Sequence, residues 1–228
     1  MKFYYDAQKT KELEAKLVEH WVKTQIPRGK EVHVYDVVYC PTKAYCRLTD
    51  VEPYFTKQVI GFFVFGVVSQ QIIQELFPPD EREYIPKKHL LDIIGHIDVF
   101  ELKLYPEEIK SSRKHIIKRS DVPQKWVEQL QCYMAKTDKN VGWLIILNIW
   151  TTGISCFCLE MTNEELAMQR LIMKKRKEKL LASVITKNPD LLDVSPEEYD
   201  TCIYKKKCPR RTYCRNKKKE IGKQQQLL

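Results

Sequence analysis

The sequence predicts an α/β fold in which a mixed β-sheet carries helices packed on its faces. Two observations predict it. Periodic segments follow one another as helix, strand, strand, helix, strand, strand and helix along the 228 residues. A hydrophobic content of 43% is also enough to fill a core of that kind. This length fits one domain of generous size. We therefore expect a single domain over residues 1–228, with its core at about residues 57–185.

Three helices are expected before the first strand. The first is amphipathic, because Leu13, Leu17 and Trp21 recur at intervals of four residues. Asp36 can cap a second, short helix that carries VVYCPTKAYCRL. The third is apolar along its length, so we expect it to be largely buried and to end before the Pro-Pro pair at residues 78–79. The first and third of these helices cover residues 9–24 and 57–77.

Strands and helices alternate in the rest of the chain. The runs LLDIIGHIDVF and LYPEEIK are typical of strands and cover residues 90–100 and 104–110. Pro123 suits the first turn of a helix through WVEQLQCYMAK. The runs WLIILNIW and ISCFCLEM flank residues 151–153 (Thr-Thr-Gly), which indicates a hairpin. A long helix is expected from Asn163 to about Ile185.

The charge of the chain favours a polyanionic partner. Lys and Arg number 39 against 30 Asp and Glu, which gives a net charge of +9. The basic residues concentrate at residues 174–179, where a solvated helix face is an equally good explanation, and at residues 205–219. The second cluster is interleaved with cysteines, so we interpret it as a nucleic-acid contact. The residues expected to bind DNA are Lys205, Lys206, Lys207, Arg210, Arg211 and Arg215.

The sequence predicts a cytoplasmic protein without a membrane partner. Its most apolar run, residues 60–68, is nine residues long and is too short to span a bilayer. The first residues, MKFYYDAQKTKELEAK, are too polar for a signal peptide. Eight cysteines in such a chain are then candidates for metal binding or for ordinary burial rather than for disulfides.

Two acidic residues and a lysine form the sharpest local pattern. Gly95-His-Ile-Asp98 is followed, after nine residues, by Glu108-Ile109-Lys110-Ser-Ser. In a strand, Glu108 and Lys110 point to the same face, and Asp98 near the end of the adjacent strand can reach that face. Carboxylates there, with the carbonyl of Ile109, can bind Mg²⁺ or Mn²⁺. Lys110 can orient or deprotonate the attacking water, or neutralise charge in a phosphoryl transition state. Surface charges on an edge hairpin are the alternative.

The positions of four cysteines suggest a second kind of metal site. One cysteine lies early, in a Cys-Pro-x-Lys segment, and three lie near the end at intervals of six residues. Four thiolates are the number that a cubane cluster needs. A structural Cys₄ zinc stays open as an alternative. The expected ligands are Cys40, Cys202, Cys208 and Cys214, with Cys46 as a substitute, whereas Cys132, Cys156 and Cys158 are expected to be buried in the core.

Taken together, GHID with Asp98, EIKSS with Glu108 and Lys110, and a QxxxY pair with Gln129 and Tyr133 resemble the RecB-like PD-(D/E)XK nucleases. Within these nucleases the chain is most similar to the iron–sulfur exonucleases of CRISPR loci, the family called Cas four. The resemblance covers roughly residues 35–216. It implies a restriction-endonuclease-like mixed sheet and a 4Fe–4S cluster that ties together an iron–sulfur lobe made of residues 36–50 and 195–216.

The resemblance also assigns roles to residues. Asp98 and Glu108 would hold Mn²⁺ or Mg²⁺, Lys110 would assist hydrolysis, and the Gln129/Tyr133 face would support the site and the DNA. The family usually has a histidine on the helix before the first strand as a further ligand. Here Gln70 lies near that place, and its amide oxygen is a weaker ligand.

The function that follows is a metal-dependent DNA exonuclease, which the resemblance implies acts 5′ to 3′ on single-stranded ends. Its role would be in CRISPR spacer acquisition or in DNA recombination and repair. CRISPR integrase proteins are expected partners beside DNA, and a homo-oligomer is compatible with the sequence. The alternative is a non-catalytic module that binds nucleic acid or docks on an integrase with a metal-clipped basic tail, which the Gln70 difference favours.

Overall fold

The computed structural model of the chain describes residues 29–86, 90–195, 199, 202–204 and 206–225, with residues 8, 11, 12, 15, 16 and 19 before them. Most of the helix expected over residues 9–24 lies outside these described residues.

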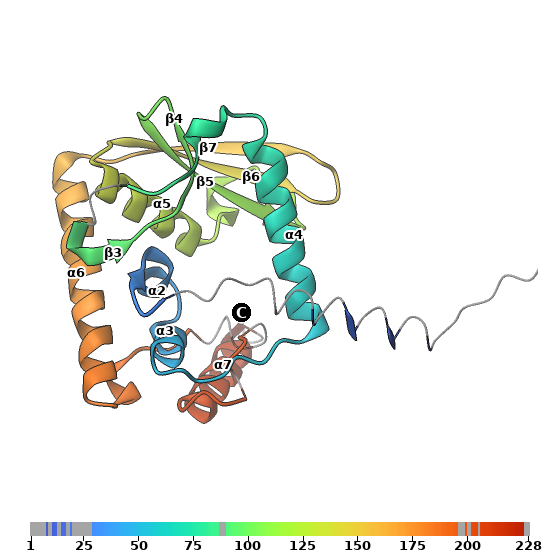
Figure 1. Cartoon of the computed structure of the whole chain (residues 1–228), viewed down its shortest axis with the longest axis vertical. Helices are drawn as coiled ribbons and strands as arrows, with labels where there is room; N and C mark the ends of the chain where they lie inside the picture. Colours follow the sequence, from blue (N-terminus) through green and yellow to red (C-terminus); the bar gives the residue numbers. More distant parts are fainter. Residues whose placement is uncertain are drawn as a thin grey trace, which may run out of the picture.

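A five-stranded mixed sheet forms the centre of the fold, so the predicted α/β class is confirmed (Figure 1). The strands lie in the order β2-β4-β5-β6-β7. β5 and β6 are parallel, and each other neighbouring pair is antiparallel. The strand bounds are β2 Arg82–Tyr84, β4 Ile97–Glu101, β5 Tyr105–Ser112, β6 Val141–Asn148 and β7 Ile154–Glu160.

Helices pack on both faces of this sheet. Along β6, Leu144 and Ile146 join the main core, whereas Ile145 and Leu147 join a smaller cluster with Ile73 of α4. Successive side chains of a strand point to opposite faces, so the apolar run of β6 is buried on both sides. Figure 1 shows α5 beneath the sheet, α6 along one side and α4 along the other. The bounds are α4 Lys57–Gln74, α5 Gln124–Thr137 and α6 Asn163–Ile185.

Segments from the two ends of the chain meet below the sheet. β1 (Val32–His33) pairs in parallel with β3 (Ile93–Ile94), and α2 (Val34–Val38) and α3 (Pro41–Leu48) follow β1. Figure 1 shows α7 (Arg211–Gln225) beside α3. The amide of Tyr54 donates to the carbonyl of Ile203 at 2.6 Å, which joins the early segment to the late one. Residues 36–50 and the described part of residues 195–216 therefore lie in one region.

The short helix around Asp36 differs from its prediction. Asp36 is the third residue of α2 rather than its N-cap residue, and it takes part in the cap because its side chain accepts from the amide of the N-cap residue His33 at 2.9 Å; it also pairs with Arg47. The expected single helix is two helices, because Pro41 begins α3. A proline has no N–H to donate and its ring clashes with the preceding turn, so a helix can start there but not pass through.

Residues 90–100 were expected to form one strand and do not. They contain a 3₁₀ turn at Leu90–Asp92, then β3, then β4. Leu91 has φ of 63°, a left-handed conformation that interrupts an extended chain. The edge strand β2 and the helix α7 were not predicted. β2 has three residues, which is too few for a periodic pattern to be visible.

Two expectations of burial were wrong. α4 leaves large apolar side chains exposed, with Phe65 54% and Ile72 53% exposed. Cys156 and Cys158 are exposed rather than buried, because alternate residues of β7 point to opposite faces and both cysteines are on its exposed face. Across the described ranges, no helix combines the length and the apolar character that crossing a membrane requires.

Candidate active site

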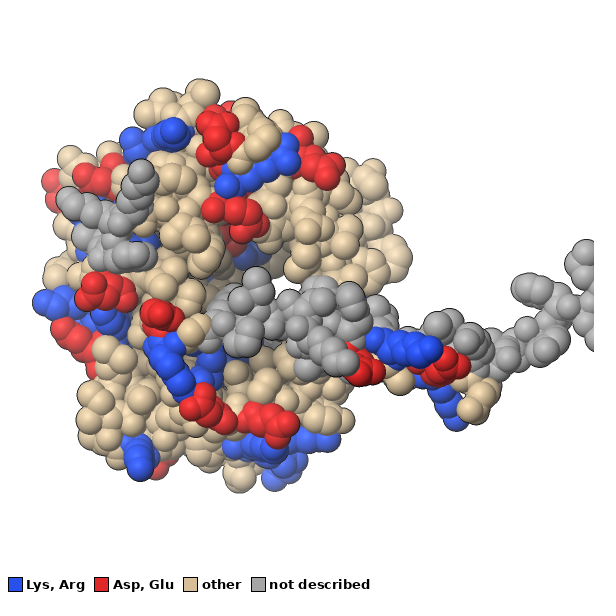
Figure 2. Space-filling view, viewed as in Figure 1, with Lys and Arg blue, Asp and Glu red and all other residues tan. Residues whose placement is uncertain are grey.

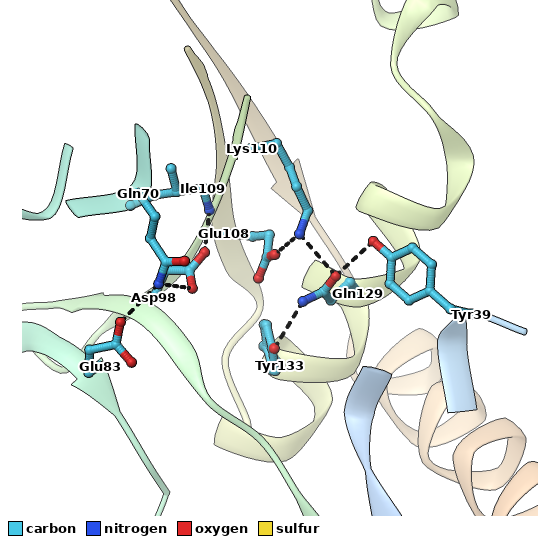
Figure 3. Close-up of polar contacts among 9 residues, drawn as sticks. All are labelled: Tyr39, Gln70, Glu83, Asp98, Glu108, Ile109, Lys110, Gln129 and Tyr133. Carbon is cyan, nitrogen blue, oxygen red and sulfur yellow. Dashed lines mark hydrogen bonds and ion pairs between the residues drawn. The ribbon is translucent and has the colours of Figure 1, made fainter. Parts of the chain in front are cut away.

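Asp98, Glu108 and Lys110 lie together where β4 and β5 separate (Figure 3). Asp98 is on β4, and its Oδ2 accepts a hydrogen bond from the amide of Ile109 at 2.7 Å. Glu108 is 1% exposed, and its Oε1 accepts a hydrogen bond from Lys110 Nζ. Glu108 and Lys110 share a face of β5 because they are two residues apart in a strand. The structure thus brings the three predicted residues to one place.

The buried carboxyl group of Glu108 and the half-buried carboxyl group of Asp98 lie close enough to influence each other's charge. Burial and then the neighbouring Glu108 raise the pKa of Asp98 well above its usual range. Burial also raises the pKa of Glu108, although Lys110 acts in the opposite direction. Among the residues that the structure describes, Glu108 Oε2 has no hydrogen-bond partner. An unpaired, buried oxygen beside a second carboxylate is suited to a hard divalent cation.

Lys110 is cationic in this arrangement. Burial alone would lower the pKa of its amine, but Glu108, Tyr39 and Asp98 outweigh burial and raise it. Its Nζ also donates to Gln129 Oε1 at 3.1 Å. Of the roles considered for Lys110, these contacts favour orienting a water and neutralising negative charge over removing a proton.

Gln129 is held by three partners. Its Oε1 accepts from Lys110 and from the Tyr39 hydroxyl at 3.0 Å, and its Nε2 donates to the Tyr133 hydroxyl at 3.0 Å. Gln129 and Tyr133 are one helical turn apart on α5, as the QxxxY spacing indicates. Burial and the two carboxylates raise the pKa of Tyr133, so its hydroxyl keeps its proton. Gln129 and Tyr133 therefore position Lys110.

Tyr39 and Glu83 belong to the site but were missed from the sequence. Tyr39 lies between α2 and α3, next to Cys40, so it links the cysteine-containing segment to the Lys110 network. Glu83 is on β2, and its charge is among the causes that raise the pKa of Asp98. No local sequence pattern predicts either residue, because contacts between distant segments place them in the site.

Gln70 presents its amide nitrogen to the site rather than its oxygen. Its Nε2 donates to Asp98 Oδ1 at 2.9 Å and to Glu83 Oε1 at 2.9 Å (Figure 3). Gln74, one turn later on α4, donates to the same Glu83 oxygen at 2.9 Å and to the Asp98 carbonyl at 2.8 Å. A half-turn of the Gln70 amide would bring its oxygen toward Asp98. As placed, its amide nitrogen joins two carboxylates.

The predicted cysteines share one cavity. Cys40, Cys202, Cys208 and Cys214 line it, and Cys46 contacts Cys208 through its thiol. That hydrogen bond from Cys46 lowers the pKa of Cys208 to about 7. Within the described residues, however, no three His, Cys, Asp or Glu side chains stand as a formed metal site. Four candidate thiolate ligands, with Cys46 as a fifth, are therefore close together. They are not arranged around a common point as the ligands of a bound metal are.

Two of the expected DNA-binding residues are engaged within the protein. Arg210 pairs with Asp190 at 3.1 Å, and its side chain is 13% exposed. It also donates to two backbone carbonyls of the 3₁₀ turn at 189–192. Lys207 pairs with Glu52. Figure 2 shows Lys and Arg alternating with Asp and Glu over the lower half of this face. The surface over this lower half is therefore not uniformly basic.

The other basic residues are more open. Lys206 lies over the Tyr54 ring at 3.2 Å. Arg211 and Arg215 are exposed on α7, and Arg211 also lines the cysteine cavity. Lys205 lies outside the described residues.

Comparison with known proteins gives a likeness in fold. No family model matches the chain, and no curated protein matches it. The solved structure titled "Crystal structure of SSO0001" has a TM-score of 0.57 with 17% identity, covering 91% of this chain and 99% of that one. The two proteins share a fold over nearly their whole lengths. "Crystal Structure of LHK-Exo in complex with dAMP" has a TM-score of 0.47 with 12% identity, covering 71% of this chain and 93% of that one.

Proposed function

We propose that the chain is a divalent-metal-dependent deoxyribonuclease of the RecB-like PD-(D/E)XK kind, similar to the Cas four exonucleases. The observation that carries this proposal is the convergence of Asp98, Glu108 and Lys110, with Glu108 buried and one of its oxygens unpaired among the described residues. The unpaired oxygen lies on the carboxylate next to Asp98, where a bound cation could satisfy it. The substrate would be DNA, with single-stranded ends attacked in the 5′ to 3′ direction.

Each site residue then has a task. Asp98 and Glu108 would hold Mn²⁺ or Mg²⁺, which supplies Lewis acidity and lowers the pKa of a bound water. Lys110, kept charged by the carboxylates, would orient the attacking water and offset charge that develops on the phosphate. Gln129 holds Lys110 through its Oε1, and Tyr133 and Tyr39 hold Gln129.

A cleavage assay tests this proposal. Wild-type protein should degrade end-labelled single-stranded DNA in Mn²⁺ or Mg²⁺ and leave it intact in EDTA, and a blocked 5′ end should protect the strand. Asp98→Asn and Lys110→Ala should each reduce the rate by at least about 100-fold. Lys103→Ala is the matched control, because Lys103 is exposed in the turn before the same strand. Undiminished activity in both site variants would remove the assignment.

We also propose that the cysteine cavity binds a 4Fe–4S cluster. Its support is that three late cysteines and an early one line one cavity, although 162 residues separate Cys40 from Cys202. Four thiolates from distant segments at one cavity match the number that a cubane cluster needs. Bound there, the cluster would fix α7 and the preceding basic segment to α3. Docking on CRISPR integrase proteins would be a further role of this region.

A non-catalytic nucleic-acid-binding protein is the second candidate. One observation favours it, because Gln70 stands where the resembled family usually has a histidine ligand and here donates to Asp98. Salt-sensitive DNA binding without any metal-dependent cleavage would support this second candidate.

A further inference from the structure

A large groove opens beside the Asp98 and Lys110 site. Its volume is about 790 Å³, within the range of ligand-binding pockets. α4 lines one side, the end of β5 and the segment after it line a second, and the start of α5 lines a third. The residues that matter to the argument are Phe62, Phe65, Arg113, Lys114, Asp121 and Trp126.

Two elements, β5 and α4, contribute residues both to the groove and to the site. Ser111 and Ser112, which line it, directly follow Lys110 on β5, so they lie within roughly 7 Å of it along the strand. Phe65 precedes Gln70 by five residues on α4, or about 7.5 Å along the helix axis. The groove therefore begins one or two residues beyond Lys110 on β5, close enough for a strand bound at the Asp98 site to reach it.

Aromatic and cationic side chains share the groove. Phe65 is 54% exposed, although burying a phenylalanine is favourable. Arg113 stacks over the Phe62 ring at 4.9 Å. Trp126 lies in the first turn of α5, a 14-residue helix whose N-terminus adds partial positive charge. Asp121 is an acidic residue of the same lining. Stacking surfaces beside cations are the combination that binds unpaired nucleotides.

We propose that this groove is a subsite for the nucleotide next to the scissile phosphate, with its base against Phe65 and Trp126 and its phosphate against Arg113 and Lys114. The subsite selects single-stranded DNA, because a base in a duplex is stacked and paired and is not free to enter. This inference rests on the proposed function, since it takes the cut strand as the occupant.

Binding without metal tests the subsite apart from cleavage. The full chain in EDTA is titrated into a fluorescein-labelled oligothymidylate and into an oligomer of abasic sites with equal length, followed by anisotropy. Phe65→Ala should weaken oligothymidylate binding by roughly 5- to 150-fold and leave the abasic oligomer unaffected. Phe65→Tyr should retain wild-type affinity. Phe63→Ala is the matched control, because Phe63 is a 38% exposed aromatic on α4 that does not line the groove.

A charge variant separates the two parts of the subsite. Arg113→Gln should weaken both oligomers alike and reduce the slope of log affinity against log salt by about 1. Unchanged oligothymidylate affinity in Phe65→Ala, or an equal loss for both oligomers, would overturn the subsite. So would a wild-type protein that binds neither oligomer.

The failures of the two proposals can be told apart. Base-selective binding that depends on Phe65, without any metal-dependent cleavage, would overturn the nuclease and leave the groove as a binding site for single-stranded DNA. Cleavage that requires Asp98 and Lys110, but with KM unchanged in Phe65→Ala, would sink the subsite alone.

Discussion

Replacing Lys110 with methionine should strongly destabilise the metal-free protein. The change keeps the length of the side chain and removes the cation beside Glu108, whose side chain is 2% exposed. Removing one partner of a buried ion pair costs about 3–5 kcal/mol, because the other charge is left uncompensated. For a chain of 228 residues, each kcal/mol lowers Tm by roughly 2–4 °C. We expect Tm to fall by about 6–20 °C in EDTA.

A second substitution should recover the stability that Lys110→Met loses. Glu108→Gln added to Lys110→Met should restore most of the lost stability, because the buried charge that needed the lysine is then gone. Thermal unfolding followed by circular dichroism measures all four proteins of the cycle, with Lys103→Met as the surface control. A loss below about 1 kcal/mol in Lys110→Met, or a double variant as unstable as the sum of the single changes, would refute the reasoning.

Three further predictions concern other parts of the chain. Burial and then Glu101 raise the pKa of Glu107 from 4.5 to about 8, so the folded carboxyl keeps a proton that the unfolded chain releases. The free energy of unfolding of the wild type should therefore fall by up to roughly 4–5 kcal/mol between pH 4.5 and 8. Chemical denaturation should show that this fall is absent in Glu107→Gln. An equal dependence of the unfolding free energy on pH in the two proteins would contradict the prediction. Anaerobically purified protein should be brown and absorb near ~400 nm, whereas a colourless zinc protein would exclude the iron–sulfur proposal. Cys40→Ser should abolish the colour and the exposed Cys158→Ser should not; colour lost only in Cys46→Ser would move the fourth ligand to that cysteine.

The sequence predicted the parts of the site that depend on local periodicity. Glu108 and Lys110 share a strand face, and Gln129 and Tyr133 share a helix face, because the spacings of two and four residues impose it. The bounds of α6 agree with expectation for a similar reason. Thr162 and Glu165 form a capping box that starts the helix at Asn163, although the cap is Thr162 rather than Asn163.

Other features depend on contacts between distant segments and leave no local signal. Glu83 enters the site because β2 pairs with β4, and Tyr39 enters because α2 packs on α5. The apolar pattern of α4 predicted burial because a helix that is hydrophobic all round is usually covered. Phe65 is open instead, since it borders the groove beside the site. The unpredicted Glu83 and Tyr39 and the exposed Phe65 are thus close to the proposed chemistry.

Binding of Mn²⁺ to the metal-free protein, followed by electron paramagnetic resonance, tests the central claim most directly. Asp98 and Glu108 must hold a divalent ion if they serve hydrolysis, so wild-type protein should remove the signal of free Mn²⁺ saturably. Asp98→Asn should abolish this binding, and Asp80→Asn, a change at an exposed aspartate, should leave it intact. Equal Mn²⁺ binding by wild type and Asp98→Asn would contradict the account.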